Sequence, residues 1–207
     1  MNWLNWPNRI SIARTLFVIP FIYFLCQMPN GGDTWRHLAL ITFVVMALSD
    51  VVDGYLARKW GQESAIGAFL DPMADKILVT AGVILLTLES TSIPGFRIPW
   101  WVCAVAIGKD VVTITGFSLI LIGVRAYFVQ PRMLGKLSTT LQSVMIAFCL
   151  VAPDLPGGLV ALWPAAYSLA TLAAIAATVD YLRLGIVFAR RASETREERQ
   201  NAESPKR

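Results

Sequence analysis

The stretch DVVDGYLARKWGQESAIGAFLDPMADK, residues 50–76, carries four aspartates: Asp50, Asp53, Asp71 and Asp75. The first two are three residues apart and the last two are four apart, so in helices each pair lies on one face. A short polar link, GQES at 61–64, separates the two halves. The stretch therefore predicts a tight antiparallel helical hairpin in which four carboxylates converge near one end.

The composition places this hairpin in an integral membrane protein. The chain has 207 residues, of which 56% are hydrophobic and 15% are charged, and its mean hydropathy is +0.57. Such a balance is unusual for a soluble domain. Six apolar windows approach the roughly 20 residues that cross a bilayer. They are residues 10–27, 37–58, 67–89, 99–123, 136–151 and 159–188. We expect an all-α fold of six transmembrane helices after a short interfacial segment, residues 1–8.

The basic residues predict the orientation of these spans. With a cytoplasmic N-terminus, most of them fall on the cytoplasmic side: Arg9, Arg14, Arg58, Lys59, Arg125, Arg132, Lys136, Arg190 and Arg191. The opposite loops hold only Arg36 and Arg97. The positive-inside rule then places both termini and the aspartates at the cytoplasmic face of a bacterial-type inner or plasma membrane. A basic rim facing anionic lipids accounts for the net charge of +4, so no nucleic-acid partner is expected.

The chain reads as one domain with a tail. Residues 1–190 form the predicted membrane domain, and the charged tail, residues 191–207, is expected to be a frayed helix that ends in disorder. Turns are predicted at the Pro/Gly-containing segments 28–33, 92–99 and 153–158.

Four carboxylates in an apolar hairpin need a compensating charge. Without one they would repel each other and lose hydration. Oxygen ligands in such a cluster suit a hard divalent cation, Mg²⁺ or Mn²⁺, and four of them suit two ions. The alternative is structural: the acids could pair with Arg58 and Lys76, or mark a helix end in water. Acids within a membrane domain are, however, a functional hypothesis by default.

Small residues lie beside the acids. Gly54 and Ala57 follow Asp50 and Asp53 by about one turn, and Gly67 precedes Asp71 by one turn. Small residues are also common at ordinary helix contacts in membranes. Here they leave space next to the predicted metal ligands, which suits a flat or phosphate-bearing substrate. Arg58 supplies a cation that can reach phosphate oxygens.

The whole pattern resembles the signature of the CDP-alcohol phosphotransferases at every position. It reads Asp-x-x-Asp-Gly-x-x-Ala-Arg from Asp50, then eight residues, then Gly-x-x-x-Asp-x-x-x-Asp from Gly67. The likeness extends from residue 7 to about 150. Further matches to the phosphatidylglycerophosphate synthase and cardiolipin synthase branches are Pro7-Asn8, Ser11, Arg14, residues 67–76, Gly135-Lys136 and residues 139–142.

The resemblance implies a six-helix membrane enzyme, typically a homodimer, that binds a CDP-linked lipid at a divalent-metal centre. By this likeness the metal ligands would be Asp50, Asp53, Asp71 and Asp75, and Asp75 would also be the general base. A carboxylate suits that role because no histidine is available near the site. The CDP-lipid would contact Asp50, Gly54, Ala57, Arg58 and Gly67, with the diphosphate held by the arginine.

The choice of acceptor alcohol depends on the fourth span and on the cations around the site. In the fourth span the first branch usually carries Arg-Glu and the second Arg-Asp, whereas this chain has Lys109-Asp110. That pair could equally be a structural ion pair. Cations near the site favour an acceptor with a phosphate; they are Arg14, Lys109, Arg125, Arg132 and Lys136. We expect transfer from CDP-diacylglycerol to glycerol 3-phosphate with release of CMP. The alternative acceptor is phosphatidylglycerol, as in cardiolipin synthases.

Two other classes of protein use acids within membranes. Membrane prenyltransferases bind diphosphates through Asp clusters and Mg²⁺, but they are longer and lack the Asp-Gly-x-x-Ala-Arg core. An ion or proton carrier would spread its acids along a path through the bilayer, whereas the four aspartates here cluster at one predicted depth. Release of CMP from a CDP-lipid would distinguish the transferase from both.

Overall fold

The computed structural model describes the backbone of residues 6–60, 65–124 and 133–203, and the side chains of 16–49, 76–116 and 133–187. Within these ranges every regular element is a helix. The elements are α1 (Trp6–Gly31), α2 (Asp33–Trp60), α3 (Ala65–Thr87), α4 (Trp100–Val124), α5 (Met133–Val151), the 3₁₀ helix η1 (Ala152–Asp154), α6 (Gly157–Val160) and α7 (Trp163–Glu203). The predicted all-α fold is confirmed.

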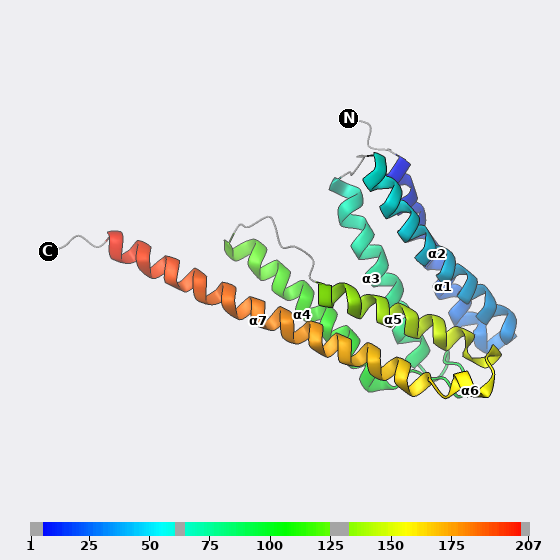
Figure 1. Cartoon of the computed structure of the whole chain (residues 1–207). Helices are drawn as coiled ribbons and strands as arrows, with labels where there is room; N and C mark the ends of the chain where they lie inside the picture. Colours follow the sequence, from blue (N-terminus) through cyan, green and yellow to red (C-terminus); the bar gives the residue numbers. More distant parts are fainter. Residues whose placement is uncertain (1–5, 61–64, 125–132, 204–207) are drawn as a thin grey trace.

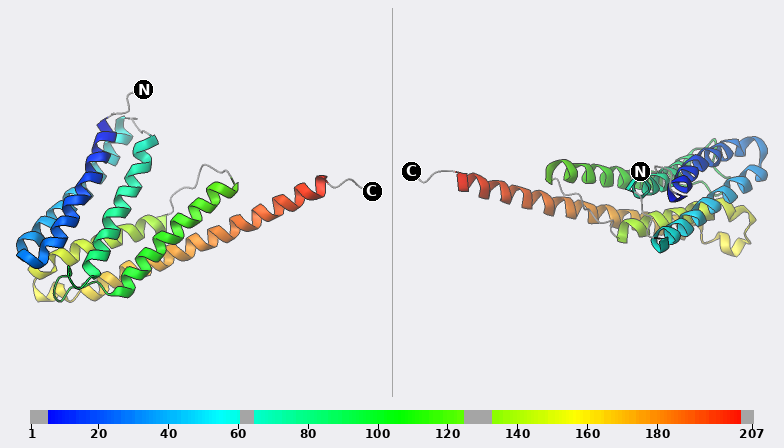
Figure 2. Two further views of the ribbon diagram at one scale, coloured as in Figure 1. Left: turned by 180° about the vertical axis from the view of Figure 1, so that it is seen from behind. Right: turned by 90° about the horizontal axis from the view of Figure 1, so that it is seen from above.

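The long helices form two connected groups (Figures 1 and 2). In the first, α1 packs against both α2 and α3. In the second, α7 packs against α4 and α5, and α5 also contacts α2 and α3. The start of α1, the end of α2 and the start of α3 lie at the same end of the molecule (Figure 1). This end carries the aspartate-bearing segments.

Glycines allow two of the predicted turns. α1 continues through Pro29 to Gly31, and a single residue, Gly32 with φ of 61°, reverses the chain into α2. Gly95, with φ of 83°, lies in the connection between α3 and α4. A positive φ costs an L-residue with a side chain roughly 1–2 kcal/mol. Both turns lie within the segments predicted from their Pro and Gly content.

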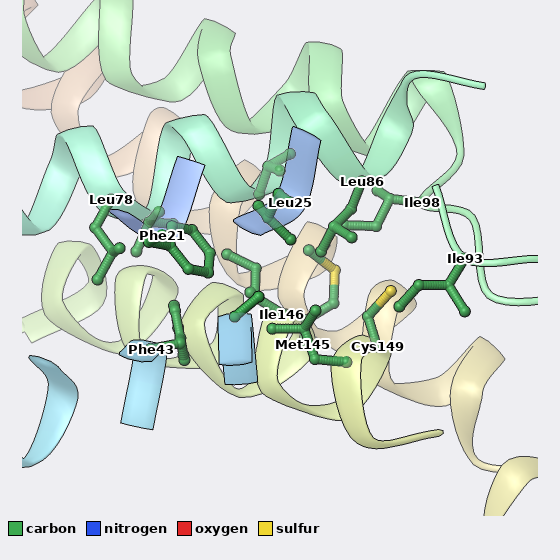
Figure 3. Packing of buried hydrophobic residues seen from close by; sticks show 14 of the residues in the cluster. Phe21, Leu25, Phe43, Leu78, Leu86, Ile93, Ile98, Met145, Ile146 and Cys149 are labelled. Atoms are coloured by element: carbon green, nitrogen blue, oxygen red, sulfur yellow. The ribbon is translucent and has the colours of Figure 1, made fainter. Parts of the chain in front are cut away.

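The core is apolar and draws on α1, α2, α3, α4, α5 and α7, and Figure 3 shows part of this packing. Phe21 of α1 packs against Phe43 of α2, with ring centroids 5.6 Å apart. Leu86 of α3, Met145 of α5 and Ala170 of α7 are also buried in this cluster. Many large apolar side chains remain exposed on the outside of the same helices. Helices that are apolar on both the inner and the outer face are typical of membrane proteins.

Two stretches within the described ranges are long and apolar enough to cross a membrane, judged by length and composition. They are Met133–Asp154 and Gly157–Val187, and Leu16–Gly31 and Lys76–Thr87 are shorter apolar helical stretches. The predicted number of six spans therefore stays a prediction.

The C-terminal segment is helical over most of its length. A frayed helix that ends in disorder is predicted for the tail, and within the described residues α7 continues as a helix to Glu203. Figure 1 shows this red end of α7 projecting beyond the other helices. The physical reason lies in the residue types, because residues 191–203 contain no Pro or Gly and include several Ala, Arg and Glu, which favour helix.

Candidate functional site

The four aspartates lie on two neighbouring helices. Asp50 and Asp53 belong to the C-terminal half of α2, and Asp71 and Asp75 to the N-terminal half of α3. Each pair spans about one helical turn. Only residues 61–64 separate Trp60 from Ala65, so these two helix ends are at most about 17 Å apart. The backbone thus has the hairpin arrangement that the sequence predicts.

The side chains of this motif lie outside the described part of the chain. The predicted CDP-lipid contacts Gly54, Ala57, Arg58 and Gly67 are on the same two helices, and their contacts stay predictions, as do those of the aspartates. Among the described side chains no group of three or more His, Cys, Asp or Glu gathers as a metal site. Because that search does not include the four aspartates, it has no bearing on the predicted metal centre.

A polar cluster begins at the residue that follows Asp75, and the side chains that we assign to it lie within the described ranges. We name it the Lys109 cluster; its members are Lys76, Thr80, Lys109, Asp110 and Gln142. Lys109 Nζ lies 3.3 Å from Asp110 Oδ1 and donates to Gln142 Oε1 at 3.1 Å. Lys76 Nζ lies 3.9 Å from the same Oδ1, and Thr80 Oγ1 donates to Asp110 Oδ2 at 3.5 Å. The cluster joins α3, α4 and α5.

Burial makes the charge of this cluster significant. The side chain of Lys109 is 4% exposed and that of Asp110 is 17% exposed, whereas Lys76 is 33% exposed. Two lysines face one aspartate, so the described cluster carries a net charge of +1. A buried charge without a full counter-charge is unfavourable unless a ligand compensates it. Lys76 directly follows Asp75, so this positive charge lies close to the aspartate motif along α3.

A buried hydroxyl accompanies the cluster. Ser138 lies four residues before Gln142 on α5, so the two side chains lie on the same face of that helix. Ser138 Oγ is fully buried and has no hydrogen-bond partner within the described side chains. Buried hydroxyls in proteins are normally paired. An unpaired one beside a net positive cluster suits the oxygen atoms of an anionic ligand.

The predicted acceptor-binding cations have different positions. Lys109 is buried in the cluster, whereas Lys136 is exposed in the first turn of α5. The side chain of Arg14, on α1, and the whole of Arg132 lie outside the described residues. The structure thus brings Lys109 together with Asp110, as the adjacent pair suggested. It adds Gln142, which sequence reasoning noted only as part of a family likeness.

Lys76 also bears on the structural alternative for the aspartates. That alternative uses Arg58 and Lys76 as counter-charges for the four acids. Lys76 has an ion-pair contact with Asp110 on α4. Its charge is therefore shared with another carboxylate, and this weakens the purely structural interpretation of the motif.

At the opposite end of the molecule, Arg36 makes a group of ionic and hydrogen-bond contacts that we name the clasp. Arg36 is buried and donates to Asp33 on α2, to Asp154 on η1 at 2.7 and 2.8 Å, and to the carbonyl of Leu150 at 2.7 Å. The hydrogen bonds to Asp154 raise the pKa of the guanidinium, so it stays charged. His37 Nε2 lies 3.1 Å from Oδ2 of the same carboxylate. The clasp ties the start of α2 to the end of α5.

These features define a class of protein: a helical protein with an aspartate hairpin next to a buried cationic cluster, as expected of a phosphate-transferring enzyme that works on lipids. The particular family follows from comparison with known proteins. Residues 4–182 match the family model of the CDP-alcohol phosphatidyltransferases. The chain belongs to the CDP-alcohol phosphatidyltransferase family. This family is membrane-associated and generally depends on a divalent metal.

Curated relatives are similar over most of both chains. A Bacillus subtilis protein named CDP-diacylglycerol–glycerol-3-phosphate 3-phosphatidyltransferase is 34% identical over 179 residues, which cover 79% of this chain and 88% of the relative. An Escherichia coli K12 protein of the same name is 32% identical over 160 residues, covering 73% of this chain and 79% of the relative. The family resemblance predicted from the aspartate pattern is confirmed.

Proposed function

We propose that this protein is a phospholipid-synthesising transferase that moves the phosphatidyl group of CDP-diacylglycerol to glycerol 3-phosphate and releases CMP. The observation that carries the proposal is the similarity to relatives named for this reaction, which extends over most of both chains. The surroundings of α3 support it, because Lys76, the residue after Asp75, belongs to a largely buried cluster whose described side chains carry a net positive charge. Such a cluster suits an acceptor that carries a phosphate.

The metal centre would be built on the hairpin of α2 and α3. The carboxylates of Asp50, Asp53, Asp71 and Asp75 would hold two divalent cations, Mg²⁺ or Mn²⁺, since hard cations prefer such oxygen ligands. The residues present fit this role: two pairs of carboxylates, each spaced by one turn, lie on helices joined by four residues. The bound metal would supply positive charge that stabilises the transferring diphosphate.

The remaining residues of the hairpin would bind and orient the CDP-lipid. Gly54, Ala57 and Gly67 would leave room for the cytidine, and Arg58 would hold the diphosphate. The hydroxyl of glycerol 3-phosphate would attack the phosphorus that bears the diacylglycerol. The bond from that phosphorus to the oxygen of the CMP phosphate breaks, CMP leaves, and the carboxylate of Asp75 takes the hydroxyl proton.

The acceptor phosphate would bind at the other side of the site. Lys109 is the best-supported ligand, because it is buried, held by two partners and in the same polar cluster as Lys76, the residue that follows Asp75. Arg14, Arg132 and Lys136 would supply further positive charge near the cytoplasmic face. Phosphatidylglycerol, the acceptor of cardiolipin synthases, would have to present a lipid phosphodiester to the same cations. The names of the relatives favour glycerol 3-phosphate.

The protein would work as a homodimer of six-span subunits, with residues 1–190 as the membrane domain and both termini in the cytoplasm. Two long apolar helical stretches support a membrane location. The charge distribution supports the orientation. Arg36 is paired with Asp33 and Asp154, and Arg97 lies 4.0 Å from Glu89. The two cations predicted to lie on the non-cytoplasmic side are therefore neutralised by neighbouring acids. The excess positive charge then falls on the cytoplasmic side, as the positive-inside rule requires.

The test is an acceptor panel with purified protein in detergent micelles that contain CDP-diacylglycerol. We expect CMP release that depends on glycerol 3-phosphate, with phosphatidylglycerophosphate as the lipid product, and little release with serine or inositol. Removal of divalent cations with EDTA should stop the reaction, and Mg²⁺ or Mn²⁺ should restore it. Formation of cardiolipin from phosphatidylglycerol, with no use of glycerol 3-phosphate, would overturn the proposed acceptor.

A further inference from the structure

The uncharged side-chain amide of Gln142 is a hydrogen-bond partner of Lys109 in the Lys109 cluster. The side chain of Gln142 lies on α5, the residue is 2% exposed, and Oε1 accepts a hydrogen bond from Lys109 Nζ at 3.1 Å. A buried amide is unfavourable unless it is hydrogen-bonded. The amide carbonyl provides a partial negative charge that directs the ammonium but does not neutralise it.

The only carboxylate of the cluster is shared between two lysines. Asp110 Oδ1 lies 3.3 Å from Lys109 Nζ and 3.9 Å from Lys76 Nζ, both within the described part of the chain. A glutamate has nearly the same shape as a glutamine. At position 142 it would give each lysine a carboxylate of its own and bring the net charge of the cluster to zero. The glutamine therefore preserves one unit of positive charge in a buried site.

We infer that Gln142 is a positioning and specificity-determining residue, which holds the Lys109 ammonium in place while leaving its charge available to a phosphate monoester on the acceptor. This inference rests on the proposed function, and it adds a residue and a reason to it. A compact dianion such as glycerol 3-phosphate gains more from an uncancelled buried cation than a neutral polyol does. The unpaired hydroxyl of Ser138, one turn away on the same face of α5, offers a hydrogen bond to the same phosphate.

Two substitutions of Gln142 test this role, because a structural role and a charge-preserving role predict opposite orders for the size of their effects. Gln142→Glu keeps a partner for Lys109 but cancels its charge, and an adjacent ammonium favours the ionised carboxylate. Gln142→Met keeps the length of the side chain, loses the hydrogen bond and leaves the net charge at +1. A purely structural role predicts that the methionine variant is the worse of the two. Our inference predicts that the glutamate variant is worse, specifically in its use of glycerol 3-phosphate.

The measurement is steady-state kinetics with purified full-length protein in micelles of detergent and CDP-diacylglycerol. For Gln142→Glu we expect the KM for glycerol 3-phosphate to rise about tenfold to a hundredfold, the range for a lost charge-assisted contact. The KM for CDP-diacylglycerol should not change. For Gln142→Met the rise in the first KM should be smaller. A larger effect of methionine, a parallel rise of both KM values, or no change in either would overturn the inference.

A double variant keeps the inference testable if the glutamate alone impairs folding. Combining Gln142→Glu with Asp110→Asn moves the single carboxylate from α4 to α5 and restores the net charge of +1. We expect this variant to recover much of the affinity for glycerol 3-phosphate, and no recovery in folded protein would contradict the inference. Failure of the proposed function has a different signature: the wild-type protein itself would release no CMP with glycerol 3-phosphate.

Discussion

Replacing Lys109 with methionine separates a functional cation from a structural ion pair. Lys109 is 4% exposed and contacts Asp110 and Gln142. Methionine has a similar length, so the change leaves little empty space. Asp110 keeps its contacts with Lys76 and Thr80, so its charge is not left without a partner. The substitution leaves the buried acceptor Gln142 Oε1 without its donor, and an unpaired buried acceptor costs about 1–3 kcal/mol. The melting temperature of Lys109→Met should therefore fall by no more than this single lost hydrogen bond accounts for.

The catalytic effect should be large and confined to one substrate. Loss of a charge-assisted contact to a phosphate costs roughly 1.5–3 kcal/mol, which corresponds to about a tenfold to hundredfold rise in KM for glycerol 3-phosphate. Thermal unfolding in detergent and the KM for each substrate are the measurements. Arg97→Met is the matched control, because it removes a half-exposed cation at the other end of the molecule. A larger fall in melting temperature together with an unchanged KM for glycerol 3-phosphate would show that Lys109 is structural.

Four further substitutions test other parts of the structure. Asp71→Asn should abolish CMP release at saturating Mg²⁺ while the protein stays folded; activity within about tenfold of wild type would exclude a metal ligand. Ala57→Leu should block binding of CDP-diacylglycerol with little effect on helix stability, because leucine is a good helix former, and normal binding in an equilibrium assay would place Ala57 away from the cytidine. Gly32→Ala should destabilise the protein by about 1–2 kcal/mol, since φ is 61° and no atom crowds the site; denaturation that matches wild type would contradict this. Arg36→Met should cost about 1–3 kcal/mol because it leaves the carbonyl of Leu150 without its hydrogen bond, and an unchanged melting temperature would show that the clasp contributes little.

Sequence reasoning predicted the features that depend on local spacing. The length and composition of the apolar windows were sufficient for the helices, and the Pro and Gly content was sufficient for the turns at Gly32 and Gly95. The spacing of the four aspartates placed two pairs of acids, Asp50 with Asp53 and Asp71 with Asp75, on α2 and α3. Local propensity also explains the length of α7: several charged residues of the tail are good helix formers, and α7 continues through them to Glu203.

Contacts between distant residues were not predictable in this way. Arg36 and Asp154 are 118 residues apart, and Lys109 and Gln142 are 33 apart. A single sequence contains no signal for such pairs, because many polar residues could meet and only the packing of the helices selects among them. The adjacent pair Lys109-Asp110 was visible in the sequence, but its role was left open between a structural ion pair and an acceptor site.

By itself, the sequence determined the family and the helical architecture, and it is the basis of the chemistry proposed for the hairpin, because each depends on residue type at fixed local spacing. The tertiary structure decided the environment of Lys109. Only when α3, α4 and α5 pack together do Lys76 and Lys109 share the single carboxylate of Asp110 while Gln142 supplies a neutral partner. The buried net charge that results is a property of three helices in contact, since charges cancel or persist according to distance in space and not along the chain.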